Sequence, residues 1–211
     1  ALGILVAGLL LSAGTLRRLE AGRLTGGPVS EAELDLLPPP ALARALALSY
    51  DAVAADLFWV RTILYFGAHV KTDGRFPRLA PLLDLVVSLD PHFLDAYRTG
   101  ALFLSFFAKD LPGAIRLLER GARANPDRWE MPHDLARLYM ILAKDPVQAM
   151  AWFRRTGALP GRPDYVPRMI AKLASQAGQR EVAIELWFRI YQETDNAYTR
   201  EQAERELRAL G

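Results

Sequence analysis

Three histidines are the side chains best suited to bind a metal ion or to transfer protons near neutral pH. They are His69, His92 and His133, and they stand far apart in the chain. Metal-binding helices commonly place two histidines four residues apart or add cysteine ligands. This chain has no such histidine pair and no cysteine among its 211 residues. The sequence therefore predicts no metal site and no cofactor.

Carboxylates stand mainly at the breaks between apolar segments. Asp90, Asp110 and Asp145 are examples, and at a helix start such a side chain accepts a hydrogen bond from a backbone N–H. A glycoside hydrolase needs two carboxylates that converge in one cleft, and the sequence does not supply such a pair. It also has neither a phosphate-binding glycine loop nor a G-x-S-x-G motif. We predict no catalytic residue.

A set of cationic side chains is better suited to bind an acidic partner through charge-assisted hydrogen bonds. Each lies three residues before or one residue after an alanine of the series Ala101, Ala136 and Ala171: Arg98, His133, Arg137, Arg168 and Lys172. Because the offsets recur, we expect these side chains to line up on one face of successive helices. The alternative is an ordinary solvated face, on which the cations pair with nearby acids such as Asp134 and Glu130.

The charge distribution argues against nucleic acid as that partner. The formal net charge is +2, and the basic excess is confined to residues 111–172, with 11 Lys or Arg against 6 Asp or Glu. A surface that binds nucleic acid normally has a larger positive excess with aromatic side chains interleaved. We therefore expect other protein subunits or peptide segments, acidic ones in particular, as partners.

The elements that position these side chains follow from a repeat. Ala101, Ala136 and Ala171 are 35 residues apart, and two further series keep this period to within one residue: Ala114, Ala149, Ala183 and Pro91, Pro126, Pro160. Apolar residues recur at helical spacing without strand-like alternation, which predicts an all-α fold. Small residues at fixed positions let paired helices approach closely. The predicted hairpins pair 93–107 with 112–123, 131–143 with 146–157, and 166–177 with 180–192.

One hairpin alone cannot bury its apolar face, so the hairpins are expected to stack. We divide the chain into an atypical first hairpin, three repeats and a capping helix: 41–90, 91–125, 126–160, 161–193 and 194–211. In the first hairpin, Ala80 precedes Ala114 by nearly one period and takes its place. In the last segment, a thin apolar stripe of Ala203, Leu207 and Leu210 in a polar helix is typical of a cap.

Helical hairpins of this length with paired small residues and a closing proline resemble tetratricopeptide repeats (TPR). The best match is NPDRWEMPHDLARLYMILAKDPVQAMAWF, and the resemblance covers 90–193 well and 41–89 weakly. The first-helix aromatic of the family occurs once, as Tyr97, and is replaced by Pro132 and Pro167 in the next two repeats. The resemblance implies a solenoid whose first helices line a concave groove for an extended polypeptide, which would make the five cationic residues a binding site.

A second surface is suggested by LFWVRTILYFG, residues 57–67, which is apolar nearly all the way round a helix. Such a helix is either buried in the first hairpin or covered by a partner. In the second case, we expect four aromatic residues to dock on a membrane subunit or a lipid interface: Phe58, Trp59, Tyr65 and Phe66.

The N-terminal segment carries no charge over residues 1–16 and is followed by Arg17, Arg18 and Arg23. As a helix it would be about 24 Å long, against about 30 Å for the hydrocarbon core; the chain opens on Ala1, and apolar residues before it would complete a span. We expect a membrane anchor in residues 1–23 and a Pro/Gly linker in 24–40. The alternatives are a signal peptide cut near Ser12-Ala13-Gly14 and a soluble core helix.

The stretch AADLFWVRTILYFG, the Trp-Glu-Met-Pro corner and the apolar N-terminus are together similar to a group of bacterial membrane-anchored repeat proteins without an assigned activity. That resemblance places the folded part on the periplasmic side, with the cytoplasmic side as the alternative. We expect a non-catalytic scaffold that assembles or stabilises a multi-protein complex. The alternatives are an accessory subunit of a membrane energy-transducing or secretion complex, which docks through 41–70, and a cell-envelope enzyme.

Overall fold

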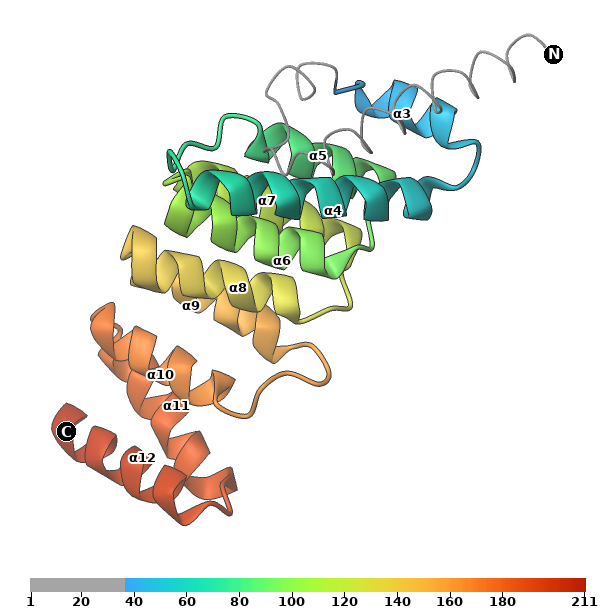
Figure 1. Cartoon of the computed structure of the whole chain (residues 1–211). Helices are drawn as coiled ribbons and strands as arrows, with labels where there is room; N and C mark the ends of the chain where they lie inside the picture. Colours follow the sequence, from blue (N-terminus) through green and yellow to red (C-terminus); the bar gives the residue numbers. More distant parts are fainter. Residues whose placement is uncertain (1–36) are drawn as a thin grey trace, which may run out of the picture.

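The computed structural model describes residues 37–211, and within that range the chain is helical without β-strands (Figure 1). The prediction of an all-α fold is confirmed. The predicted anchor and most of the predicted linker lie outside the described residues. Among the helices of 37–211, none is both long and apolar enough to cross a bilayer.

The helices follow one another as hairpins in a row, and from Asp51 onward each helix packs mainly against its neighbours along the chain. The bounds of the three predicted hairpins differ from the observed ones by at most one residue, and the segment 41–70 forms two helices. The elements are α3 (Pro40–Ala47), α4 (Asp51–Val70) with α5 (Leu79–Leu89), α6 (Leu94–Leu102) and η1 (Phe103–Phe107) with α7 (Leu111–Ala124), α8 (Glu130–Leu138) and η2 (Tyr139–Ala143) with α9 (Pro146–Gly157), α10 (Val166–Gln176) with α11 (Arg180–Glu193), and α12 (Ala197–Leu210).

The alanines that set the predicted period occupy equivalent buried positions. Each member of both series is at most 2% exposed: Ala101, Ala136, Ala171, Ala114, Ala149 and Ala183. Four residues after the second alanine of each pair, a large apolar side chain is fully buried; these are Leu118, Phe153 and Trp187. Small residues bring the two helices together, and the large ones fill the space beside them.

The first hairpin keeps the period but not the expected register. Ala80 is exposed, so the prediction that it takes the place of Ala114 is wrong. Leu79, 35 residues before Ala114, is fully buried in that position. Leu82 and Leu83 are likewise buried 35 residues before Leu117 and Leu118. The repeat period between the first and second hairpins is therefore 35 residues. A shift by one residue matters because it moves a side chain by about 100° around the helix axis.

The turn inside each hairpin also repeats at backbone level. Four residues at nearly equal steps along the chain have a positive φ, with values of 64°, 58°, 55° and 72°: Gly74, Lys109, Lys144 and Gly178. The left-handed conformation ends one helix and redirects the chain into the next. Asp110 and Asp145 follow two of these residues and accept hydrogen bonds from Gly113 N–H at 2.8 Å and Gln148 N–H at 3.0 Å. The predicted capping role of both aspartates is confirmed.

Candidate binding groove between α6 and α8

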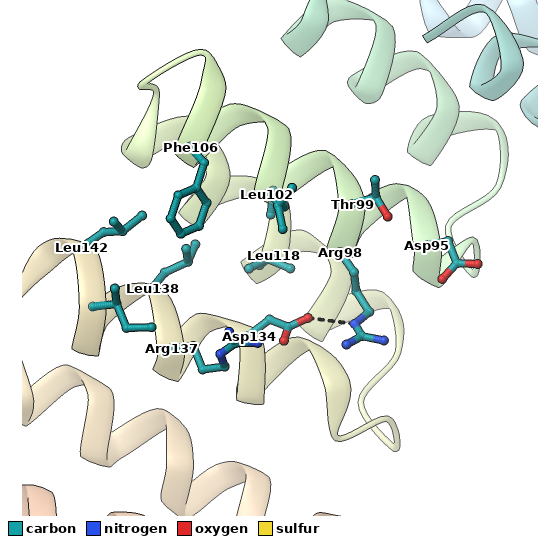
Figure 2. A pocket seen from close by; sticks show the side chains of 12 residues that line it. Asp95, Arg98, Thr99, Leu102, Phe106, Leu118, Asp134, Arg137, Leu138 and Leu142 are labelled. Carbon is teal, nitrogen blue, oxygen red and sulfur yellow. Dashed lines mark hydrogen bonds and ion pairs between the residues drawn. The ribbon is translucent and has the colours of Figure 1, made fainter. Parts of the chain in front are cut away.

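A pocket of about 330 Å³ opens between two first helices of neighbouring hairpins (Figure 2). One wall is α6 with η1, and the other is α8 with η2. Leu118 of α7 also contributes to the lining. The lining side chains separate into a polar end and an apolar end, which are described in turn.

The polar end is formed by Asp95, Arg98, Asp134 and Arg137. Arg98 donates from Nε to Asp134 Oδ2 at 2.7 Å, which ties α6 to α8 across the groove. Burial raises the pKa of Asp134, but hydrogen bonds from His133 and Arg98 and the charge of Arg98 outweigh it, so the pKa lies below its ordinary value. Asp134 therefore stays ionised at neutral pH and balances the charge of Arg98.

Arg137 is the cation of this groove that has no internal counterion. Its side chain is exposed, and it forms no hydrogen bond or ion pair with another residue of 37–211. Arg98, by contrast, is held by Asp134. A guanidinium offers five donors in a fixed plane, which suits a carboxylate. Of the two predicted cations in the pocket, Arg137 is thus the one available to an acidic ligand.

The apolar end consists of Leu102 and Phe106 on one wall and Leu138, Ile141 and Leu142 on the other. Leu102 is 47% exposed, Phe106 44% and Ile141 47%. Figure 2 shows Phe106, Leu102, Leu138 and Leu142 around the same space. Apolar side chains that line a concave surface beside fixed polar groups are typical of a ligand site.

Two π-helical turns carry apolar residues of the pocket. Phe106 lies in η1 and Ile141 in η2, 35 residues apart in the sequence. A π-turn closes i→i+5 bonds, as between Ala108 N–H and the Phe103 carbonyl at 3.0 Å, and such turns are frequent at functional sites. No sequence pattern indicates these turns, because the apolar residues of 103–107 fit an ordinary helix equally well.

His133 does not lie on an exposed strip. It is 5% exposed and packs among the rings of Trp129, Phe153 and Tyr165, with centroid distances between 5.5 and 5.9 Å. Its Nδ1 lies 3.2 Å from Asp134 Oδ1, and its Nε2 hydrogen-bonds to the Tyr165 hydroxyl. The Tyr165 hydroxyl of the next repeat closes over the ring. His133 therefore supports Asp134 and offers no surface to a partner.

The other two residues of the predicted cationic set lie outside the pocket, on α10. Arg168 donates from Nη1 to Gln202 Oε1 of α12 at 3.3 Å. Lys172 is exposed and has no hydrogen-bonding or ionic partner among residues 37–211. The structure thus brings Arg98 and Arg137 together in the pocket. His133 contacts Asp134 but does not line the pocket, and Arg168 and Lys172 lie on α10.

The aromatic residues of the predicted docking surface point inward or are partly covered. Tyr65 is 1% exposed, and its hydroxyl accepts a hydrogen bond from Arg78 N–H at 3.1 Å. Phe66 stacks on Phe103 at 3.7 Å between centroids, and Trp59 meets Phe93 edge to face at 5.7 Å. Phe58 is a partly buried member of the same core. Of the two interpretations, packing in the core therefore describes these residues better than an exposed docking surface: Tyr65 is buried, and the other three are partly buried in the core shared with the next hairpin.

Two carboxylates do line the groove, contrary to the expectation that the repeat supplies no such pair. They are Asp95 and Asp134. A glycosidase pairs an ionised carboxylate with an acid whose pKa is raised. Asp134 has a lowered pKa, and both of its oxygens face Arg98 or His133. This geometry suits a structural ion pair better than acid catalysis.

No protein-family model matches the sequence, and a search of curated proteins found no significant match.

The three histidines lie in separate places: His69 contacts the Tyr65 carbonyl at 3.0 Å, and His92 contacts Asn125 Oδ1 at 2.9 Å. Within 37–211, no group of three or more His, Asp or Glu residues is placed to hold a metal ion.

Proposed function

We propose that this chain is a non-catalytic protein-interaction scaffold that binds a segment of another subunit in the groove between α6 and α8. The observation that carries the proposal is the pairing of Arg137, which has no counterion within 37–211, with the exposed Leu102, Phe106 and Ile141 in one pocket. The ligand that fits is an extended or helical segment with an acidic side chain followed by apolar ones.

The packing supports a TPR-like solenoid as the scaffold. From α4 onward, each helix contacts mainly the helix before and after it, and the alanines and turn residues recur with one shared period. Such a row leaves the first helices of successive hairpins side by side, as α6 and α8 are. We further propose that residues 1–16 tether the scaffold to a membrane, with the folded part on the periplasmic side of a bacterial cell.

The ligand class is testable with a displayed library of random peptides selected on the full chain in mild detergent. Selected peptides should contain Asp or Glu beside Leu, Ile or Phe. Arg137→Glu should weaken their binding at least about tenfold, because one charge-assisted hydrogen bond is replaced by repulsion. Ile141→Glu should weaken it as well, because the apolar end is lost.

Lys172→Glu is the matched control, since it makes the same charge change on an exposed residue outside the pocket. Arg137→Lys should keep part of the affinity. Equal binding by the wild type, Arg137→Glu and Ile141→Glu would refute the groove as the site. Pull-down from native membranes with the wild type, Arg137→Glu and Ile141→Glu then identifies the cellular partner.

A further inference from the structure

The outer face of α4 is apolar although the inner face is already used for the core. Val53, Leu57, Val60 and Leu64 are 54%, 68%, 55% and 59% exposed, respectively. Their spacing of 4, 3 and 4 residues places them in one stripe along the helix. The residues buried in the core lie on the other side of the helix: Ala55, Thr62, Tyr65 and His69. This stripe, Val53 to Leu64, is not accounted for by the groove.

The stripe continues onto the preceding segment. Tyr50 is 71% exposed and Leu46 of α3 is 67% exposed. Both also line a pocket of about 320 Å³ between α3 and α4, together with Val53 and Leu57. Figure 1 shows α4 beside α3 at the N-terminal end of the row. A contiguous apolar surface of this kind on a protein marks an interaction site.

We propose that a second copy of this chain covers the stripe, with the two α4 helices antiparallel about a two-fold axis. The axis passes between Leu57 and Val60, so that Leu57 of each copy packs against Val60 of the other. Val53 then meets Leu64, and Tyr50 meets Gly67. Such an interface uses the same patch on both subunits, as two-fold dimers do.

Side-chain volume favours this orientation. Each aliphatic pair across the proposed interface consists of one valine and one leucine, so the spacing between the two helices is the same at every pair. The large Tyr50 lies over Gly67, and a Cβ built at Gly67 would meet no atom within 4 Å. A parallel pair would place Leu on Leu, Val on Val and Gly on Gly, which alternates tight layers with voids.

The area fits a modest dimer. At about 100 Å² for an aliphatic side chain and about 200 Å² for a tyrosine, the six residues from Leu46 to Leu64 expose on the order of 450 Å² per copy. Two copies bury about 900 Å² of side-chain surface, which lies below the roughly 1,200 Å² of stable specific interfaces and within the range of weak ones. The dimer is therefore concentration-dependent.

A lipid surface fits less well. Asp56 is exposed and follows Val53 by three residues, at the edge of the stripe. Immersion of the stripe in a bilayer would bring this carboxylate to the headgroups, where anionic lipids repel it. At the rim of a protein dimer, Asp56 remains in water.

The absence of native cysteine makes disulfide trapping specific. Full-length chains carrying Val53→Cys or Leu64→Cys, distinguished by a mass tag, are co-expressed and oxidised in intact membranes. We expect a Val53–Leu64 hetero-crosslink in at least about tenfold excess over either homo-crosslink, because the antiparallel arrangement separates like positions by about 16 Å. Val147→Cys, an exposed valine on α9, is the control and should not crosslink. Homo-crosslinks of Val53→Cys or Leu64→Cys in equal yield would overturn the antiparallel arrangement.

A second measurement guards against trapping of chance encounters. Sedimentation equilibrium of the full chain in mild detergent should give a dimer whose dissociation constant rises at least about 100-fold in Leu57→Asp and little in Val147→Asp. A monomer at every concentration, with no hetero-crosslink in membranes, would overturn the proposal. If Leu57→Asp leaves the mass unchanged and phosphatidylcholine vesicles protect the thiol of Leu57→Cys from a water-soluble maleimide, lipid covers the stripe and the proposal fails.

Discussion

At the scale of single residues, Asp134 is the most constrained ionisable group of the groove. Its side chain is 17% exposed and hydrogen-bonds to Arg98 and His133. Both partners stabilise the ionised form, and the resulting pKa lies below the ordinary value of 3.8. A carboxylate whose pKa falls on folding stabilises the native state above its unfolded pKa and loses that contribution on acidification.

Asp134→Asn should lower the free energy of unfolding by about 1–3 kcal/mol at neutral pH, since a partly buried charge-assisted bond is lost. The difference from the wild type should shrink as the pH falls from about 3.8, where the carboxylate of the unfolded chain takes up a proton, through the lower pKa of the native state. Urea unfolding of both proteins at a series of pH values on either side of that point tests this. A difference that is constant over the series would show that the charge is not involved.

Lys144 occupies a backbone conformation that glycine adopts without cost. Its φ is 55°, and the equivalent residue of the next hairpin is Gly178 with a φ of 72°. Lys144→Gly should therefore raise stability by about 0.5–1 kcal/mol, and Gly178→Ala should lower it by about 1 kcal/mol. Thermal unfolding of the two variants measures both. Opposite signs for the two substitutions are the result that matters, and equal signs would contradict the shared conformation.

At the scale of elements, α7 holds both walls of the groove. Gly121 of α7 faces Tyr97 of α6, and a Cβ built on Gly121 would lie 2.9 Å from the tyrosine ring and 3.1 Å from Met131 Sδ of α8. Three helices meet at this point. The glycine is required here by close approach and not by an unusual φ.

Gly121→Ala should destabilise the protein by about 1–3 kcal/mol, because the buried ring of Tyr97 has no room to move away. Gly157→Ala in α9 is the matched control, because the atoms nearest to its Cβ would lie at the ordinary contact distances of 3.6 and 3.7 Å. That control should be neutral or stabilising by up to about 1 kcal/mol, the helix propensity of alanine over glycine. Chemical denaturation distinguishes the two, and a stabilising Gly121→Ala would contradict the packing described.

The helices themselves were predictable, whereas several side-chain environments were not. The periodic alanines and prolines predicted the helix bounds, because the residues that end a helix act on their own stretch of the chain. The burial of His133 depends on Tyr165, in the following repeat, and no local pattern reveals that contact. The exposed stripe on α4 could not be predicted either, because the sequence of a helix that is apolar all round does not indicate which side faces the core.

At the scale of the whole molecule, the C-terminal helix covers the last hairpin. Ala203 of α12 is fully buried, and Leu207 and Leu210 pack against the same core as Trp187. α12 packs mainly on α11. The predicted apolar stripe of the cap, Ala203, Leu207 and Leu210, is therefore the part of α12 that contacts the core.

Removal of residues 196–211 should destabilise the protein unevenly. In a row in which helices contact their neighbours, exposure of α11 should first unfold α10 and α11, while α6 and α7 keep their protection. Amide hydrogen exchange of the truncated and full chains measures this directly. Uniform loss of protection from α4 to α11 would show instead that the helices unfold as one cooperative unit.

The width of the groove depends on residues of α7 that do not line the pocket. α6 and α8 touch each other sparingly, and each is seated on α7. Small residues on the hidden side of α7, such as Gly121 and Ala122, thus decide how far apart the two walls stand. Substitutions at these positions would change the width of the groove, and so the size of ligand that fits, without changing any residue that lines it.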